Sequence, residues 1–506
     1  MKKLLFGILI VGLAAQSCTK VNENVYDKLA ATQFYSTAAG ADDALATVYG
    51  SISGTWSSNY AGRDNCWYDL NEYSSDEQVI PHRNTGDWQL DFAQLYTRTE
   101  LPSLGIIDNT WKWAYGAIYQ ANQAIAELTA AKADPSKIAE ARVARAWFYY
   151  LLIDDFGNVP FYTDNNTPIS KIPQSPRATI YNFIVSELKV NVDLLSTTRG
   201  GTYYGRFNKW AGYMILAKVY LNAGVYTGTP DWQDALTACN VVASGGYTLH
   251  PATSSATSPL GNTYYDLFGD VCPNDETIFA IYLTENVISG NVYTIRSLNT
   301  PTGTALFGFA GWNGTIIPQE FYSNFSSNDI RTQQFLVGQQ PDGTVYTPTV
   351  SSLIDPGAAP NEGIRDVKFY VLDNATSANK FGGIHDASGS SNDFPVYRYA
   401  DVLLMQAECE LRLGNTSAAA PYLNQVRERA GLADIAAPTL TDVYNERGFE
   451  LNMEGHRRQD MIRFGTYLNA HGFVTQGQAY MELFPIPSAE ITTNPLLKQN
   501  PGYPTN

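Results

Sequence analysis

Helical periodicity that falls into two separate blocks is the feature that most constrains how this chain can fold. Apolar residues recur at three- and four-residue spacing from about residue 38 to 245, and again from about 399 to 470. In the first block this spacing predicts helices at 38–53, 111–125, 136–156, 178–195, 210–223 and 232–243. In the second block it predicts helices at 401–413, 416–430, 440–454 and 457–469.

Short connections join several of these helices into pairs. Gly224 and Pro230 lie in one connection, and Gly414-Asn415 forms another, with Thr416 as the expected N-cap of the helix that follows. Paired helices with Ala at their crossing points are typical of tetratricopeptide-like repeats. The full repeat consensus cannot be placed along the chain, so an irregular helical bundle is the alternative. In both cases we expect a mainly α fold.

The stretch between the two blocks, 246–396, differs in composition. It is rich in Gly, Ser, Thr, Asn and Pro, and short β-like pieces occur at 277–283 and 292–295. A structureless loop of this length is improbable inside a compact domain. The sequence therefore predicts a large loop-rich region with short strands that packs on the helices.

The N-terminus has the pattern of an export signal. Lys2 and Lys3 precede an apolar run from 4 to 15, and Cys18 follows a small residue. We expect residues 1–17 to be a signal peptide and Cys18 to be acylated, as in a lipoprotein. Ala15 and Gln16 depart from the usual lipobox, so an ordinary secretory signal is the alternative. No later stretch approaches about 18 apolar residues, so lipid would be the only membrane attachment.

The charge balance narrows the choice of partners. Asp and Glu number 49 against 33 Lys and Arg, which gives a formal net charge of -16. Nucleic acid binding needs clustered Lys and Arg, so nucleic acid is not an expected partner. Aromatic residues make up 13% of the chain, and exposed Trp and Tyr are typical of recognition surfaces.

The sequence supports no metal or cofactor site. The five histidines form no HExxH motif, and the cysteines after the signal form no CxxC pair. These cysteines are Cys66, Cys239, Cys272 and Cys409; the second and fourth fall in helical patterns as small buried residues, and disulfide pairing is left open. A calcium site in the loop-rich region is an alternative that no spacing supports, and its residues would be Asp355, Asp366, Asp373 and Asp386.

Six stretches of the chain, taken in order, carry a resemblance to a known family. They are NEYSSDE at 71–77 with the loop through Trp88, the helix from 111 to 122, EAR at 140–142 through FGNVP at 156–160, RYAD at 398–401 through Gly414, ER at 446–447 through RFG at 463–465, and FPIP at 484–487 through NPGY at 500–503. Together they resemble the SusD/RagB family of outer-membrane nutrient-binding lipoproteins. The resemblance spans the mature chain.

This resemblance implies both a fold and a role. The fold would be mostly α-helical, with tetratricopeptide-like pairs on one side and the loop-rich region on the other. It would comprise an N-terminal SusD-like part at 18–245 and a C-terminal SusD/RagB part at 246–506, forming one compact unit. The role would be to bind a glycan at the cell surface and pass it to a SusC-like, TonB-dependent transporter in the outer membrane. The helical face would dock on that transporter, and the loop-rich face would hold the ligand.

A carbohydrate site needs flat aromatic side chains for the sugar face and Asp, Asn or Arg groups for the hydroxyls. Two segments supply this mixture, and they provide the candidate ligand-binding residues His82, Arg83, Asn84, Asp87 and Trp88 in one loop, and Trp312 and Asn313 in the other, with Tyr293 nearby in sequence. Trp56, Tyr60 and Trp67 are further candidates that nothing separates from core packing. The alternative is that the tryptophans are core residues and the polar residues cap turns.

Acidic residues at Glu446, Glu450 and Glu454 resemble a catalytic cluster, but we expect them to be structural and paired with Arg side chains. A glycoside hydrolase would need two carboxyls about 5–9.5 Å apart across a cleft. Asp76, Glu77 and Asp87 are the only nominees in the sequence, and no signature sets them apart. We therefore expect a binding protein and no enzyme. Binding of a peptide or another nutrient in the same role is the second alternative.

Overall fold

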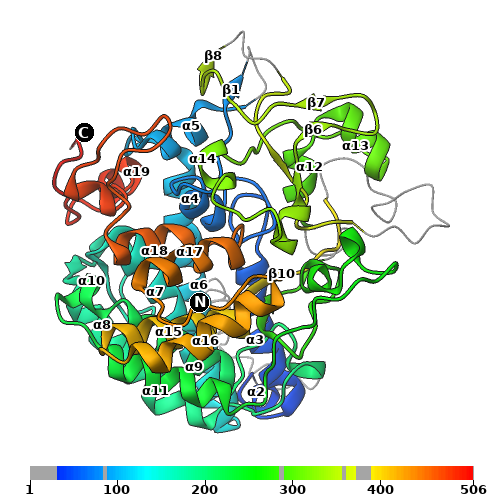
Figure 1. Ribbon diagram of the computed structural model, residues 1–506. Coiled ribbons are helices and arrows are strands. Elements are labelled where there is room, and N and C mark those ends of the chain that lie inside the picture. The colour runs from blue at the N-terminus through cyan, green and yellow to red at the C-terminus, as the bar shows by residue number, and fades with distance from the viewer. Residues whose placement is uncertain (1–30, 84–87, 284–289, 356–359, 372–388, 505–506) are drawn as a thin grey trace, which may run out of the picture.

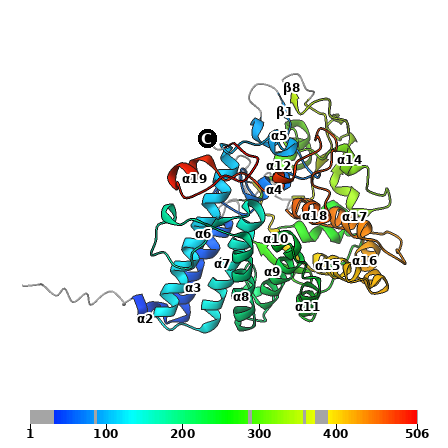
Figure 2. The ribbon, with the colours of Figure 1, turned by 90° about the vertical axis from the view of Figure 1, so that its left-hand side faces the viewer.

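The computed structural model describes residues 31–83, 88–283, 290–355, 360–371 and 389–504 (Figure 1). The predicted signal peptide and Cys18 lie outside these residues. The first helical block contains α2 (Ala31–Tyr35), α3 (Ala38–Ser53), α4 (Trp67–Glu72), α5 (Leu90–Thr97), α6 (Gly105–Ala130), α7 (Pro135–Phe156), α8 (Arg177–Asn191), α9 (Lys209–Leu221), α10 (Ala223–Thr227) and α11 (Trp232–Ala243). Helices α3, α6, α7 and α8 lie side by side, and α9 pairs with α11 (Figure 2).

Helix α7 shows how the sequence sets the limits of a central helix. The Asp134 side chain accepts a hydrogen bond from the Ser136 amide at 2.8 Å, and Pro135 occupies the first turn, where its missing N–H is not needed. Gly157, with φ of 73°, ends the helix in a conformation that a side chain would disfavour. Almost every residue after Ile138 is buried, so α7 forms the centre of the helical block.

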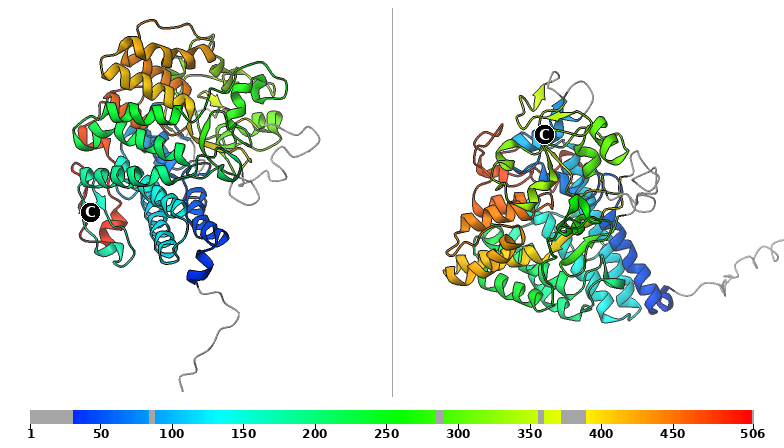
Figure 3. Two further views of the ribbon diagram at one scale, coloured as in Figure 1. Left: turned by 90° about the horizontal axis from the view of Figure 1, so that it is seen from below. Right: turned by 45° about the vertical axis from the view of Figure 1, so that its right-hand side comes forward.

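The second helical block packs directly on the first. It contains α15 (Tyr399–Arg412), α16 (Thr416–Arg429), α17 (Leu440–Glu450) and α18 (Arg457–Phe464), and α15 packs against α11. Seen from below, the helices coloured from blue through green to orange form one continuous array (Figure 3). The mainly α fold with paired helices is thus confirmed.

Three predicted details of the second block are wrong. Asn415, not Thr416, is the N-cap of α16, and its side chain makes no capping hydrogen bond. The helix predicted at 440–454 ends at residue 450, because Met453 and Gly455 adopt left-handed backbone conformations with φ of 60° and 77°. The helix predicted at 457–469 ends at residue 464, where Gly465 has φ of 73°.

The region between the blocks is loop-rich, as predicted, and one strand pair joins its early part to its end. Strand β4 (Thr277–Ile281) pairs antiparallel with β10 (Phe394–Arg398), and both strands are buried along their length. The remaining strands are two residues long: β1 (His82–Arg83) pairs with β8 (Ile354–Asp355), β2 (Val159–Pro160) with β3 (Gln174–Ser175), β5 (Phe335–Leu336) with β9 (Arg365–Asp366), and β6 (Gly338–Gln339) with β7 (Val345–Tyr346).

Short helices and 3-10 turns are scattered through the rest of the described residues. They are α12 (Tyr293–Ser297), α13 (Thr300–Phe307), α14 (Gln319–Tyr322) and α19 (Ser488–Thr493), with 3-10 turns at Ile169–Lys171, Val192–Leu194, Gly201–Tyr203, Pro259–Gly261, Thr263–Phe268, Ile330–Gln334 and Ala479–Glu482. The prediction of a β-like piece at 292–295 is therefore wrong. Arg296 at the end of α12 donates to Asp69 at 2.8 Å and 3.1 Å, and this buried ion pair outweighs the local strand propensity.

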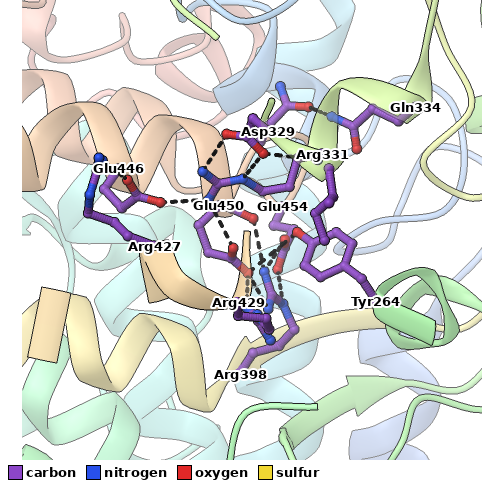
Figure 4. Close-up of polar contacts among 12 residues, drawn as sticks. Tyr264, Asp329, Arg331, Gln334, Arg398, Arg427, Arg429, Glu446, Glu450 and Glu454 are labelled. Carbon is purple, nitrogen blue, oxygen red and sulfur yellow. Dashed lines mark hydrogen bonds and ion pairs between the residues drawn. The ribbon is translucent and has the colours of Figure 1, made fainter. Parts of the chain in front are cut away.

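The acidic residues of the second block are paired with arginines, as predicted (Figure 4). Arg398 is fully buried and contacts Glu276 at 2.6 Å, Glu450 at 2.9 Å and Glu454 at 2.6 Å. Arg331 contacts Glu446 at 2.8 Å and Glu450 at 3.1 Å. We call this set, with Arg427 and Arg429, the Arg–Glu network. Because every carboxylate in it faces at least one guanidinium inside the protein, the network is structural and not a catalytic centre.

The four cysteines in the described residues are free and buried. Cys66, Cys239, Cys272 and Cys409 therefore act as small core residues, and burial raises the pKa of each thiol.

Candidate functional site

Three tryptophans from distant parts of the chain meet on one side of the molecule. Trp56 follows α3, Trp88 precedes α5, and Trp312 follows α13. The ring centroids of Trp56 and Trp312 lie 6.2 Å apart, and those of Trp88 and Trp312 lie 6.4 Å apart. Trp56 is 36% exposed, and the other two are half-buried. We call this set the tryptophan cluster; it presents indole surface to solvent, although Trp88 also packs against the main core.

A rigid turn holds Trp56 in place. Gly54, with φ of 55°, ends α3, and the backbones of Thr55 and Ser58 then exchange two hydrogen bonds of 3.2 Å. The fully buried Asn59 side chain donates to the carbonyl of Thr55 at 2.6 Å and to that of Trp56 at 3.1 Å. Because these bonds fix the turn, the backbone that carries Trp56 needs no ordering when a ligand binds.

Trp88 and Trp312 are locked to each other. The Trp88 indole N–H donates to the Trp312 carbonyl at 3.1 Å. A Cβ at Gly314 would lie 2.5 Å from the Trp88 indole, so glycine is needed there for the ring to pack this closely. Asn313, between them, adopts φ of 55°, a conformation that Asn tolerates better than most residues.

Two buried arginines support the turn that carries Trp312. Arg83 donates to the Asn313 carbonyl, and Arg365 donates to the Asn313 side-chain oxygen at 2.8 Å. Burial, together with the nearby charge of Arg83, lowers the pKa of Arg365 to about 9. The Arg365 guanidinium therefore stays charged at neutral pH and holds Asn313 by a charge-assisted bond.

A cation lies against the exposed tryptophan. The guanidinium carbon of Arg63 lies 5.0 Å from the centroid of Trp56. Burial lowers the pKa of Arg63 to about 10, so it too is charged at neutral pH. Arg63 is itself 4% exposed, so it supports the Trp56 ring and is not an open donor. The cluster thus offers flat apolar rings, on which the apolar face of a sugar ring can stack.

The sequence-based candidates divide into three groups. Trp88, Trp312 and Asn313, which were nominated in two separate segments, lie together, and the half-buried His82 ring contacts the Trp88 carbonyl. Arg83 lies at the same place but is buried and supports the turn from behind. Asn84 and Asp87 lie outside the described residues.

Tyr293 requires a correction. It is 2% exposed, its hydroxyl accepts a hydrogen bond from the Gly62 amide at 2.7 Å, and its ring packs on Tyr68 with centroids 4.5 Å apart. Since both its ring and its hydroxyl are taken up by the core, Tyr293 cannot stack on a ligand in this arrangement. Tyr60 and Trp67 are likewise buried and stack on each other in the core.

Sequence reasoning missed Arg63 and did not separate Trp56 from packing residues. The available signal was Gly54, which ends a helix two residues before Trp56, just as glycines flank Trp312. A glycine stop followed by an aromatic residue places that ring on a turn instead of on a buried helix face.

The carboxyls nominated for hydrolysis are engaged elsewhere. Asp76 forms a two-point ion pair with Arg457, at 2.7 Å and 2.9 Å. Glu77 is buried beside Glu72, and burial together with that neighbouring carboxyl raises the pKa of Glu77 well above its usual range. Asp76 and Glu77 therefore make contacts within the protein. Asp87 lies outside the described residues.

The described residues hold no group of three or more His, Cys, Asp or Glu side chains that could ligate a metal ion. Within the same residues, no helix has the length and apolar character needed to cross a membrane.

Two family models match the chain and together cover most of it. A model described as the SusD family matches residues 232–503. A second, described as starch-binding and associating with the outer membrane, matches residues 64–221.

Curated proteins of the same kind match over most of their length. A SusD-like protein of Formosa agariphila is 27% identical over 444 residues, which cover 78% of this chain and 80% of that protein. The starch-binding protein SusD of Bacteroides thetaiotaomicron is 25% identical over 426 residues, which cover 72% of each.

Solved structures share the fold. Surface glycan-binding protein A from Bacteroides thetaiotaomicron superimposes with a TM-score of 0.74 at 22% identity, covering 92% of this chain and 100% of that one. The same protein in complex with laminarihexaose gives a TM-score of 0.72 at 21% identity, covering 92% and 99%. A laminarin-binding SusD-like protein gives 0.69 at 22% identity, with the same coverage.

Proposed function

The chain belongs to the SusD family, and from that premise we propose that it is a cell-surface lipoprotein that binds an oligosaccharide or polysaccharide and delivers it to a SusC-like, TonB-dependent transporter. In this proposal the acyl groups on Cys18 anchor it in the outer membrane. The partners are the glycan and the transporter, and no cofactor takes part.

The tryptophan cluster is the observation that carries the binding proposal. A pyranose ring has an apolar face that stacks on flat aromatic rings, and hydroxyls at its edge that need fixed polar groups. Trp56, Trp88 and Trp312 supply the rings, with Arg63 beside the exposed one. Relatives with the same fold are named as glycan-binding proteins, and one was solved with laminarihexaose, which supports a carbohydrate over a peptide.

Isothermal titration calorimetry and affinity electrophoresis of the soluble mature chain test this proposal. The probes are a polysaccharide panel that includes laminarin and starch, and a peptide mixture. We expect binding to at least one polysaccharide, and Trp312→Ala should weaken it about tenfold or more. Trp232→Ala is the matched control, because Trp232 is a half-buried tryptophan on α11, outside the cluster. Binding to peptides alone, or to no probe at all, would reject the proposal.

Two further assays address delivery and catalysis. A strain that lacks the gene should lose growth on the bound glycan and keep growth on peptides; the reverse pattern would favour the peptide alternative. The purified protein should release no reducing ends from that glycan. Release of reducing ends that persists in the Trp312→Ala variant but is lost when a carboxyl side chain is replaced would favour a hydrolase.

A further inference from the structure

A groove of about 730 Å³ lies between α3 and the end of β4. Trp56 lines it, and so does Tyr282, which follows β4. Trp56 therefore belongs both to this groove and to the tryptophan cluster, since its ring is also 6.2 Å from that of Trp312. The volume is in the range of about 300–1,000 Å³ that ligand-binding cavities occupy.

The groove offers a second exposed aromatic ring. Tyr282 is 47% exposed, although it directly follows a strand whose residues are all buried. Leu45 and Ile52 of α3 also line the groove and are buried. An exposed tyrosine beside apolar residues forms a surface against which the flat face of a sugar ring can lie.

Charged groups line the same groove and are held in place. Arg206 makes a two-point ion pair with the buried Glu140 through bonds of 2.8 Å each, and its remaining terminal nitrogen lies 3.1 Å from Asp42. The Asp42 side chain is half exposed, so its carboxylate keeps a face toward solvent. Oriented guanidinium and carboxylate groups beside exposed rings suit the hydroxyls of a neutral sugar.

We infer that this groove is a further subsite for the ligand of the tryptophan cluster, so that one carbohydrate chain of several residues passes over Trp56 and continues along Tyr282 between α3 and β4. The inference rests on the proposed function, and it adds the groove along which a chain that extends beyond the tryptophan cluster continues. The shared Trp56 gives the chain a continuous path between the two surfaces. Recognition of chain length follows, because only a longer ligand can reach both surfaces at once.

Calorimetry with fragments of two and six sugar residues tests the inference, using fragments of the panel polysaccharide that binds. The six-residue fragment should bind wild type about tenfold or more tightly than the two-residue fragment. Tyr282→Ala should remove most of this gain and leave the affinity for the shorter fragment unchanged. Tyr119→Ala is the matched control, because Tyr119 is 50% exposed on α6 and does not line the groove.

A second variant blocks the groove without removing a ring. Gly50 lies within α3, lines the groove, and has open space where a side chain would begin. Gly50→Phe should therefore fold normally, since glycine is a poor residue inside a helix, and it should lower affinity for the longer fragment only.

The outcomes separate this inference from the proposed function. If both variants bind the longer fragment as tightly as wild type while Trp312→Ala weakens binding, the groove subsite is overturned and the proposed function stands. An equal loss for both fragments would also overturn it. If no fragment or polysaccharide binds wild type, the proposed function fails and the subsite fails with it.

Discussion

The tryptophan cluster and the Arg–Glu network both join segments that are distant in sequence, but they differ in solvent exposure. The cluster brings residues 56, 88 and 312 together and leaves Trp56 open to solvent. The network brings residues 276, 331, 398, 446, 450 and 454 together with at most 1% of each side chain exposed. The side chains of Arg429 and Arg427, which complete it, are 5% and 18% exposed. One region is arranged for contact with an outside partner, while the other has every charge satisfied within the chain.

This difference explains why acidic residues are a poor guide to function here. Carboxylates that are buried against guanidiniums are fixed and saturated, so they have little capacity to act on a ligand. The turn that carries the exposed Trp56 is held instead by uncharged hydrogen bonds, among them those that the Asn59 side chain donates to the carbonyls of Thr55 and Trp56. Predictions that test this contrast concern stability in the network and binding in the cluster.

The largest expected effect is on the network. Arg398→Met removes the charge that three buried carboxylates share, and it should lower the free energy of unfolding by about 3–5 kcal/mol. Chemical denaturation at pH 7 measures the change. A loss under about 1 kcal/mol would show that Arg331, Arg429 and Lys368 neutralise these acids without Arg398. The network would then differ less from the tryptophan cluster in its importance for stability.

The next prediction uses pH, because the pKa values of two buried carboxyls outside the network shift in opposite directions. Burial would raise the pKa of Asp460 on α18, but the nearby Arg447 and Arg463 outweigh it and lower that pKa to about 2. In the loop-rich region, burial raises the pKa of Asp366 to about 7, and its Oδ2 atom has no hydrogen-bond partner among the described residues. Asp460 therefore loses its stabilising effect as pH falls below its unfolded value of about 3.9.

Asp366 behaves in the reverse manner. Its contribution to stability is complete below about pH 4 and is lost as pH rises through about 7, because the folded state must then hold a buried charge. In wild type, this should lower the free energy of unfolding by on the order of 2 kcal/mol between pH 4 and 7.5. The Asp366→Asn variant, which has no carboxyl to ionise there, should not show this loss. Denaturation curves across that range measure it, with wild type as the reference. An unchanged slope in the variant would contradict the assignment of a protonated Asp366.

A smaller effect is expected when one ring of the cluster is displaced but not removed. Gly314→Ala places a Cβ 2.5 Å from the Trp88 indole, so the ring must move. Affinity for the bound glycan should fall about threefold to tenfold in calorimetry, with little change in melting temperature. Gly105→Ala is the control, because a Cβ there meets nothing within 4 Å. Equal binding by both variants would mean that the position of the Trp88 ring does not matter to the ligand.

The smallest effect belongs to an exposed ion pair that resembles the network only in its charges. Lys112 contacts Asp108 at 2.6 Å, but its side chain is 56% exposed. Lys112→Ala should change the free energy of unfolding by no more than about 0.5 kcal/mol. A loss comparable to that of Arg398→Met would show that solvent exclusion is not what distinguishes the network.

Much of the helical scaffold could be predicted because its information is local. The predicted helices at 38–53 and 232–243 agree with α3 and α11 at both ends. The prediction failed where a distant partner decides the backbone, as in α12, whose Arg296 is held by Asp69 more than two hundred residues away. The structure turns the segment of Tyr293 into a buried helix for that reason.

The binding surface could be predicted only in part, for a related reason. Trp88 and Trp312 were recognisable because polar or glycine-rich loops surround them. Whether a given tryptophan faces solvent depends on which remote segments cover it. For this reason Trp56 is exposed and Trp67 is buried. Arg83 had the right chemistry in the right loop, yet tertiary packing turned it inward.

The β4–β10 pair has a consequence for how such proteins can diversify. Ile281 pairs with Phe394, so the segment between them starts and ends at one strand pair. Within the segment, Arg296 and Arg331 also anchor it to the helices, through Asp69 and through Glu446 and Glu450. Lengthening a segment whose ends are already joined adds little entropic penalty, about 0.6 kcal/mol per doubling. Length changes in this segment, which supplies Trp312 and begins with Tyr282, are therefore best tolerated between its anchors. The ligand surface can then be altered while Arg296 and Arg331 keep the segment attached to the helices.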